Sequence, residues 1–293
     1  MATRPIIDTH LHIWDPNPLD YPWHADAPVL NRPFGLEDFD AARGATDVRA
    51  MVFLECDVRA DLAYDEAAWI SDMAKDDTRI KAIVASAPLE KGDEARAEIE
   101  RLRELPLVRG IRRIYQDEPD LAFCLRPDFI AGVRSLAAYD LSFDISMNWR
   151  YMENTIRFAG KCDNVPMILD HLGKPDIAGG QLDPWRKQMK ELAALPHVTC
   201  KMSGVATEAD HDNWTREELR PFILEAVGAF GFDRLMFGGD WPVATLAIEY
   251  PEWVEVLEWA LDGATEEELG KLFHDNAIAF YRLELDGENT APS

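Results

Sequence analysis

The sequence predicts a (β/α)8 barrel that occupies the whole chain, residues 1–293, as one domain. Apolar, β-branched runs recur along the chain, helical patterns lie between them, and polar residues follow the carboxyl ends of several runs. A length of 293 residues suits one large α/β barrel or two ordinary domains, and no linker rich in Pro, Gly or Ser divides the chain. A doubly wound sheet is the alternative. However, neither G-x-G-x-x-G nor G-x-x-x-x-G-K-[ST] occurs, so a dinucleotide or P-loop site lacks support.

The predicted elements alternate along the chain. We expect strands at residues 6–12, 50–55, 81–87, 108–114, 141–147, 166–172, 198–204 and 234–240. Apolar residues at steps of three and four predict helices at 61–75, 93–104, 128–138, 151–161, 184–194 and 215–229, and a closing helix near 251–261. The proline-rich segment 13–43 is expected to be a long first loop of the active site, since the loops after the strands carry function in this fold. The core then runs from about 6 to 283, and 284–293 form a polar, frayed tail.

The first predicted strand ends in two histidines, His10 and His12. Residues two apart on a strand point to the same face, so both imidazoles project side by side. Such a pair can form half of a metal site or two hydrogen-bond donors for a developing oxyanion. A His-x-His motif alone also occurs by chance. The polar residues at the ends of the later strands are therefore what makes it informative.

Alternation along the strands predicts which side chains enter the barrel. The predicted inward residues are Asp8, His10, His12, Gly110, Arg112, Ser142, Asp144, Ser146, Met167, Leu169, His171, Thr199, Lys201, Ser203, Met236, Gly238 and Asp240. Polar groups inside a barrel cost desolvation free energy unless they have partners. Their accumulation near the carboxyl ends of the strands therefore predicts an active site at that rim.

Asp240 is the best candidate for a catalytic base. It follows two glycines and precedes Trp241-Pro242, which ends the strand. A carboxylate at that rim can take a proton from water and return it to a leaving oxygen, whereas the alternative is an Asp that only caps a turn. His171 could ligate a metal, orient the water or polarise a carbonyl. Since no G-x-S-x-G elbow is present, water is the expected nucleophile.

The composition excludes several kinds of partner. The chain has 54 acidic and 30 basic residues and a formal net charge of -24, which argues against nucleic acid and anionic membranes. No apolar run approaches the roughly 18 residues of a membrane span, and we expect no signal peptide. Four dispersed cysteines without C-x-x-C predict reduced thiols in a cytoplasmic protein. We expect a small-molecule substrate and a monomer or small homo-oligomer.

Several segments together resemble the amidohydrolase superfamily, in its branch of sugar lactonases and 2-pyrone-4,6-dicarboxylate lactonases. The resemblance runs from residue 6 to about 283, with the motifs in the family's order. The matching segments are 7–15, 21–23, 110–112 with 116–119, 170–175, 201–204 and 237–243. The resemblance implies a (β/α)8 barrel, lactone hydrolysis and roles for the residues that match: His10, His12, His171, Arg112 and Asp240.

The chain departs from the superfamily's metal-rich members. The fourth predicted strand offers no bridging lysine, and Asp144 stands where those members have a histidine on the fifth. Two-metal hydrolysis is therefore not expected. One divalent ion, with zinc as the first choice, or no ion at all remain the two possibilities. The candidate ligands are His10, His12, His171 and Asp240.

The expected reaction is hydrolysis of an uncharged aldonolactone of the L-fucono-, L-rhamnono- or L-galactonolactone type. Asp240 deprotonates a water that His171 orients. His10 and His12, directly or through one ion, and Arg112 stabilise the oxyanion. The candidates for substrate contact are Trp23, Glu55, Asp144, Trp149 and Lys201.

Three rival functions remain beside this reaction. A 2-pyrone-4,6-dicarboxylate lactonase would need several cationic contacts, but of the adjacent Arg112 and Arg113 only one can face the pocket. In addition, the segment 116–120 resembles the sugar-lactonase version. A non-hydrolytic decarboxylase on the same barrel is the second rival, and a catalytically silent sugar-acid binding protein is the third.

Overall fold

The computed structural model describes residues 4–285, which form one sheet of eight parallel strands in sequence order. The strands are β1 (Ile6–Leu11), β2 (Val48–Leu54), β3 (Ile80–Ser86), β4 (Val108–Arg112), β5 (Ser142–Ile145), β6 (Met167–Leu169), β7 (Val198–Met202) and β8 (Leu235–Phe237). The Asp240 N–H donates to His10 O at 2.7 Å and the His12 N–H to Trp241 O at 2.9 Å, so the sheet curls until its first and last strands meet. The predicted (β/α)8 barrel is confirmed, and the doubly wound alternative is wrong because strand order follows the sequence.

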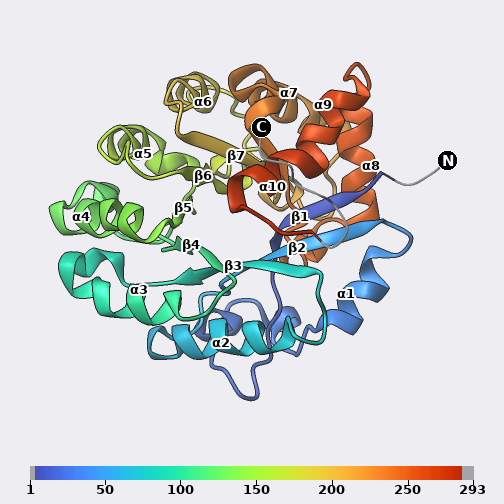
Figure 1. Ribbon diagram of the computed structural model, residues 1–293. Helices are drawn as coiled ribbons and strands as arrows, with labels where there is room; N and C mark the ends of the chain where they lie inside the picture. The colour runs from blue at the N-terminus through green and yellow to red at the C-terminus, as the bar shows by residue number, and fades with distance from the viewer. Residues whose placement is uncertain (1–3, 286–293) are drawn as a thin grey trace.

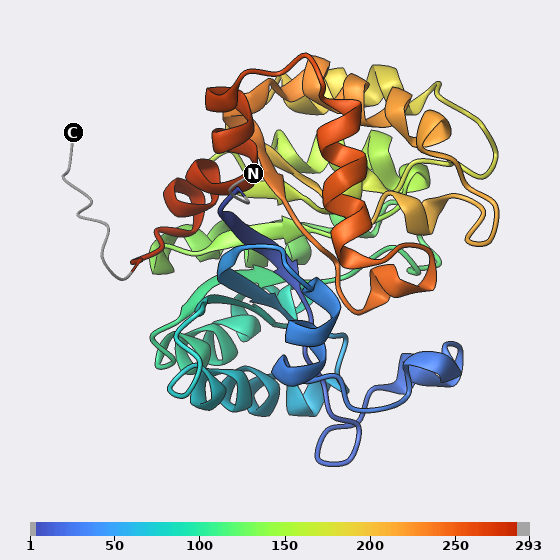
Figure 2. The same cartoon turned by 90° about the vertical axis from the view of Figure 1, so that its right-hand side faces the viewer.

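Helices surround the strands (Figure 1). They are α1 (Leu36–Arg43), α2 (Ala63–Met73), α3 (Arg96–Arg103), α4 (Pro127–Ser135), α5 (Met152–Ala159), α6 (Trp185–Ala193), α7 (Arg216–Phe230), α8 (Tyr250–Ala260), α9 (Glu266–Gly270) and α10 (Asn276–Tyr281). Helix α1 lies within 13–43, where the sequence predicts only a loop. Its single buried residue is Phe39, so no apolar periodicity marks it. The rest of that segment lies on the side where the strands end (Figure 2).

Apolar side chains fill the barrel itself. The inner cluster comprises Ile7, Ala50, Val52, Leu54, Ala82, Val84, Ile168, Met236, Ala277, Tyr281 and Leu283. Of these, Ala277 and Tyr281 lie on α10, and Leu283 lies two residues after the end of that helix. Helix α10 lies at the end of the barrel opposite to the long first loop (Figure 2). The C-terminal segment therefore closes one end of the barrel, and the loops after the strands form the other.

The predicted alternation is wrong on two strands. On β1, Ile7 belongs to the inner cluster, and an irregularity in register lies between Asp8 and Leu11. Asp8 therefore leaves the barrel interior and accepts hydrogen bonds from the Tyr250 hydroxyl at 3.0 Å and the Gly239 N–H at 2.9 Å. On β6, Ile168 is inside while Met167 and Leu169 pack against the helices.

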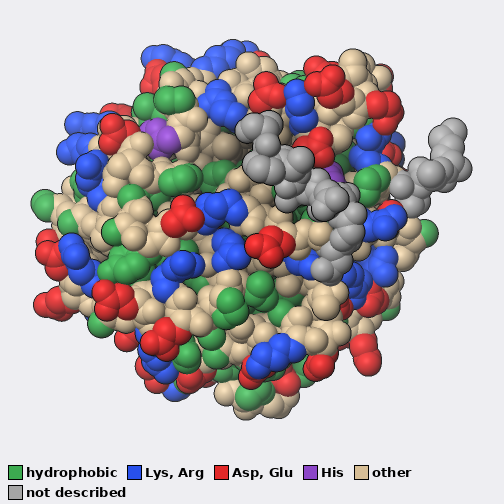
Figure 3. Space-filling model, viewed as in Figure 1, with side chains coloured by type: hydrophobic (Ala, Val, Ile, Leu, Met, Phe, Trp, Pro, Cys, Tyr) green, Lys and Arg blue, Asp and Glu red, His purple; other side chains and the backbone are tan. Residues whose placement is uncertain are grey.

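Acidic and basic side chains are interspersed on the face shown in Figure 3, so this face has no large patch of one charge. None of the helices within residues 4–285 is long and apolar enough to cross a membrane. The predicted tail at 284–293 lies almost entirely outside the described residues.

Candidate active site

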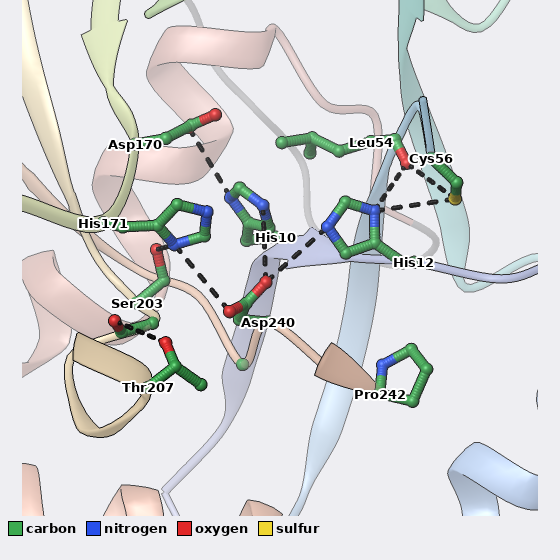
Figure 4. A network of polar contacts seen from close by, with 12 residues as sticks. His10, His12, Leu54, Cys56, Asp170, His171, Ser203, Thr207, Asp240 and Pro242 are labelled. Atoms are coloured by element: carbon green, nitrogen blue, oxygen red, sulfur yellow. Dashed lines mark hydrogen bonds and ion pairs between the residues drawn. The ribbon is translucent and has the colours of Figure 1, made fainter. Parts of the chain in front are cut away.

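Three buried side chains meet where β1 and β8 end (Figure 4). Nε2 of His10 lies 3.7 Å from Oδ1 of Asp240, and Nε2 of His12 lies 3.6 Å from the same oxygen. The backbone hydrogen bonds between β1 and the segment after β8 fix this arrangement. The sequence prediction that these strand ends converge therefore agrees with the structure.

His171 reaches the same point through a turn rather than through strand alternation. Strand β6 ends at Leu169, and His171 and Leu172 then adopt left-handed backbone conformations, with φ of 52° and 55°. The turn directs Asp170 into the barrel. It also places the centroids of the His171 and His10 rings 4.2 Å apart. Nδ1 of His171 lies 3.0 Å from Oγ of Ser203 and 3.9 Å from Oδ2 of Asp240.

The backbone at the site is strained where the side chains converge. Asp240 has a φ of 55°, in the left-handed region like His171, and such strain in non-glycine residues concentrates at functional sites. Gly204 faces both side chains. A Cβ atom there would lie 2.4 Å from Nδ1 of His171 and 3.0 Å from Oδ2 of Asp240, so this position requires glycine.

The hydrogen bonds of the two β1 histidines define where their protons are. Nδ1 of His12 lies 2.9 Å from the Leu54 carbonyl oxygen, which can only accept, so Nδ1 carries a proton and Nε2 is the nitrogen that faces the site. Nε2 of His10 lies 3.2 Å from an Arg112 guanidinium nitrogen, which can only donate. Burial also lowers the pKa of His10 well below its ordinary value, so this imidazole is neutral. Both histidines thus direct Nε2 at the site, an arrangement that suits ligation of a cation by these two nitrogens.

Burial alone would raise the pKa of Asp240, but the neighbouring His171 and His12, together with Lys174, lower it below its ordinary value. The carboxylate is therefore ionised at neutral pH and can accept a proton. Burial lowers the pKa of His171 well below its ordinary value, although the Asp240 carboxylate beside it acts in the opposite direction.

The donor set fits one divalent metal ion. Two imidazole nitrogens and a carboxylate oxygen are typical zinc ligands, and bonds of 2.0–2.1 Å place tetrahedral ligands about 3.4 Å apart. Nε2 of His10 and His12 lie at 3.7 and 3.6 Å from Oδ1 of Asp240, close to that spacing. A second group of His10, Asp170 and His171 also lies close enough together to share an ion. However, an ion there would lie beside the cations of Arg112 and Lys201, which pair with Asp170 at 3.4 and 3.0 Å.

Arg112 is held rigidly between β2 and β6. Its Nε donates to Oε1 of Glu55 at 2.6 Å, another nitrogen donates to the Glu55 carbonyl, and a third lies 3.4 Å from Asp170. Burial lowers the pKa of Arg112, but Glu55 and Asp170 more than offset this effect and raise it. The guanidinium is thus a fixed positive charge at the cavity.

A cavity of about 300 Å³ opens above these residues. It is lined by His12, Trp14, Trp23, Cys56, Asp57, Arg112, Ile114, Gln116, Asp117, Ser146, His171, Lys174, Thr207, Glu208, His211, Asp240, Val243 and Leu246. Aromatic and aliphatic side chains form part of its wall, and amide and charged side chains form the rest. A volume of this size is at the lower end for small-molecule sites and suits one sugar ring.

The five predicted substrate contacts divide into two sets. Trp23 lines the cavity, and its Nε1 donates to the Cys56 carbonyl at 2.7 Å. Glu55, Asp144 and Lys201 are buried and do not line the cavity, so we withdraw substrate contact for them. Trp149 lines a separate cavity with Trp185 and is likewise misplaced by the sequence prediction.

Several cavity residues were missed because they lie on loops. Lys174, Glu208 and His211 line the cavity. Lys174 lies within the segment 170–175 that the sequence singles out, but it is not among the predicted site residues. His24, in the long first loop, is buried against Trp14 and other aromatic rings and does not line the cavity.

These features define a (β/α)8 barrel in which three histidines and an aspartate converge at the strand ends. The chain belongs to the amidohydrolase family, whose model matches residues 7–283.

Named relatives and a solved structure cover nearly the whole chain. It is 35% identical to the L-fucono-1,5-lactonase of Burkholderia multivorans, over 94% of this chain and 96% of that protein. It is 31% identical to the L-fucono-1,5-lactonase of Burkholderia ambifaria, over 95% and 96%. A crystal structure of an amidohydrolase from Burkholderia multivorans with bound zinc has a TM-score of 0.86 and 34% identity, and the match covers 96% of this chain and 100% of that one.

We expect at most one tightly bound divalent ion per chain, because Arg112 and Lys201 place positive charge where a second ion would lie. Elemental analysis of protein purified without chelator measures this. His12→Ala should lower the bound metal, whereas His197→Gln is the matched control because His197 contacts Ala159 O, away from the cavity. Two equivalents of metal in the wild-type protein would contradict the prediction.

Proposed function

We propose that this protein hydrolyses the ester bond of an uncharged sugar aldonolactone, with L-fuconolactone as the first candidate. The observation that carries the proposal is an ionised, buried Asp240 among three histidines, His10, His12 and His171, at the floor of a sugar-sized cavity. The two L-fucono-1,5-lactonases among the relatives support the choice of substrate.

The reaction begins with a water molecule between Asp240 and the lactone carbonyl. Asp240 accepts a proton from this water, which His171 orients, and the oxygen attacks the carbonyl carbon. Arg112, which lines the cavity, stabilises the negative charge on the carbonyl oxygen. The bond between the carbonyl carbon and the ring oxygen then breaks. Asp240 returns its proton to that oxygen, and the product is the open-chain hydroxy acid.

His10, His12 and Asp240 would hold a divalent ion if one binds. Such an ion supplies positive charge for the oxyanion and makes bound water more acidic. His10 and His12 contribute lone pairs rather than protons in that role, consistent with their hydrogen bonds to Arg112 and Leu54.

The wall of the cavity suits a sugar ring. Trp14 and Trp23 offer aromatic faces, and Val243 and Leu246 offer an aliphatic surface. Polar groups on the lining, such as the Gln116 amide, can bind the hydroxyls of a sugar. Apolar faces combined with a few polar groups are typical of sites for small neutral ligands.

Acid release from a panel of lactones tests the proposal. L-Fucono-, L-rhamnono- and L-galactonolactone are followed with a pH indicator, and the spontaneous rate is measured without protein. We expect at least one of them to be hydrolysed well above this rate. If none is, or if the protein instead releases carbon dioxide from an aromatic acid, the proposal is wrong.

The pH dependence should reflect a carboxylate base with a low pKa. The base works only when ionised, so activity is lost as the pH falls through its pKa, which lies below the ordinary value of 3.8. We therefore expect kcat/KM to stay level from pH 7 down to about 5. Burial and the nearby Glu55 raise the pKa of Asp57, which also lines the cavity, to about 6. An inflection near that pH that persists in Asp57→Asn would contradict the prediction.

We also propose a cytoplasmic location. The cysteines at 56, 124, 162 and 200 are free and buried, as expected of a protein in a reducing compartment. A monomer or small homo-oligomer that does not bind nucleic acid stays a prediction from the sequence.

A further inference from the structure

A cluster of buried charges lies beneath the site and away from the cavity. Lys201 is 0% exposed, and its Nζ lies 2.5 Å from Oδ2 of Asp144 and 3.0 Å from Oδ1 of Asp170. The Tyr281 hydroxyl, from α10, donates to Oδ2 of Asp144 at 3.0 Å. Buried ion pairs are seldom the most stabilising choice for a core. The cluster therefore calls for a role other than packing.

Asp170 connects this cluster to His10. Its Oδ1 lies 3.5 Å from Nδ1 of His10, and Figure 4 shows the two groups facing each other. Within the described part of the chain, Nδ1 of His10 has no other polar partner, whereas Oδ1 of Asp170 also pairs with Nζ of Lys201. Asp170 thus pairs with the cations of Lys201 and Arg112, at 3.0 and 3.4 Å, which favour its ionised form.

The proton of His10 faces that carboxylate. Arg112 approaches Nε2 of His10 at 3.2 Å and can only donate, so the single proton of the neutral ring is on Nδ1. A carboxylate beside the remote N–H of a histidine fixes its tautomer and ring orientation and makes the other nitrogen a better ligand. Asp170 has the position and charge for this role.

We propose that Lys201, supported by Asp144 and Tyr281, is a positioning residue that holds Asp170 against His10 and so fixes the Nδ1–H tautomer of His10. Nε2 then keeps its lone pair on the side of the ring that faces the active site, where Arg112 approaches at 3.2 Å. The C-terminal helix α10 thereby supports the active site from the opposite end of the barrel, through one hydroxyl. The catalytic consequence rests on the proposed lactonase function, whereas the tautomer does not.

Nitrogen-15 NMR of histidine-labelled protein measures the tautomer directly. The His10 signals are assigned by their loss in His10→Asn. In the wild-type protein we expect His10 to carry its proton on Nδ1. The double variant Lys201→Met with Asp144→Asn removes one positive and one negative charge, so the net buried charge is unchanged. We expect its His10 to show a mixture of tautomers, and Tyr281→Phe to show a smaller change in the same direction.

Two further measurements accompany the spectra. Changes to groups behind a metal ligand typically weaken metal affinity or activity by about 10- to 100-fold. We expect this loss in the zinc affinity of the double variant, measured by chelator competition. A similar loss in kcat, with KM changed less than about threefold, is expected with lactone as substrate. Thr155→Val is the matched control, since it removes a buried hydrogen bond, to Tyr115, that lies outside the cluster.

The outcomes separate positioning from a purely structural role. A wild-type His10 protonated on Nε2 would overturn the proposal without any variant. A folded double variant with unchanged His10 signals would also overturn it, as would equal losses of zinc affinity and kcat in Thr155→Val. If no lactone is hydrolysed but the tautomer changes as expected, the proposed function fails and the positioning role stands.

Discussion

Asp240→Asn is expected to lower kcat for a lactone by about 10²- to 10⁴-fold, the usual contribution of a general acid–base group. The amide keeps the shape of the side chain but cannot accept the proton of the attacking water. In the structure this carboxylate is ionised, lines the cavity and lies within 4 Å of all three histidines. Steady-state kinetics on the lactone with the highest activity measure the loss.

A control distinguishes loss of the base from loss of the fold. Asp176→Asn changes a carboxylate that lines the separate cavity near Trp149, and should retain wild-type kinetics. Thermal unfolding by circular dichroism should give similar midpoints for both variants. If Asp240→Asn is folded and retains more than about a tenth of the wild-type kcat, another group must be the base.

The sequence was sufficient for the barrel because its strands are apolar runs with helices between them. It was insufficient where local geometry departs from a regular pattern. The short helix α1 buries only Phe39, so its sequence shows no apolar residues at helical spacing. Because of the register irregularity in β1, Asp8 points out of the barrel rather than into it. Its carboxylate accepts a hydrogen bond from the Gly239 N–H and does not reach the site.

The site was predicted most accurately where the strand ends alone determine it, at His10, His12 and Asp240. His171 was placed correctly for the wrong reason, because the left-handed turn after β6 is not encoded in any alternation. The same turn explains why Asp170 was overlooked.

The sequence also did not predict how far each inward side chain lies from the cavity. Lys201 and Asp144 do face inward, but each lies two residues before the serine that reaches the rim, Ser203 or Ser146, and so one layer below it. Alternation gives the face of a strand and not the distance of a side chain from the cavity. Loop residues such as Lys174 and Glu208 carry no periodic pattern, so only the structure could bring them to the cavity.

The second large effect concerns the charge of the substrate. We expect kcat/KM for the best uncharged aldonolactone to exceed that for 2-pyrone-4,6-dicarboxylate by about three decades or more. Burial of a carboxylate without a partner costs several kcal/mol, and about 1.4 kcal/mol corresponds to each tenfold change in rate. Asp57, Asp117, Glu208 and Asp240 line the cavity and oppose a dianion.

The two cations of the cavity do not reverse this expectation. Arg112 already pairs with Glu55 at 2.6 Å and Asp170 at 3.4 Å. Burial acts to raise the pKa of both Glu208 and Asp240, and Lys174 acts to lower it, so the charge of this lysine is already directed at these carboxylates. Glu208→Gln removes one of them and frees Lys174. This variant should therefore narrow the ratio between the two substrates, with its main effect on KM for the dicarboxylate.

Side-by-side kinetics on the three sugar lactones and the pyrone decide between the substrates. If the wild-type protein hydrolyses the pyrone faster than every sugar lactone, the preference for a neutral substrate is wrong, and Lys174 becomes the partner of a substrate carboxylate. Lys174→Met would then abolish hydrolysis of the pyrone. Under the preference argued above, the same variant leaves the uncharged lactones as better substrates than the pyrone, because a neutral ring does not require a free cation at the rim.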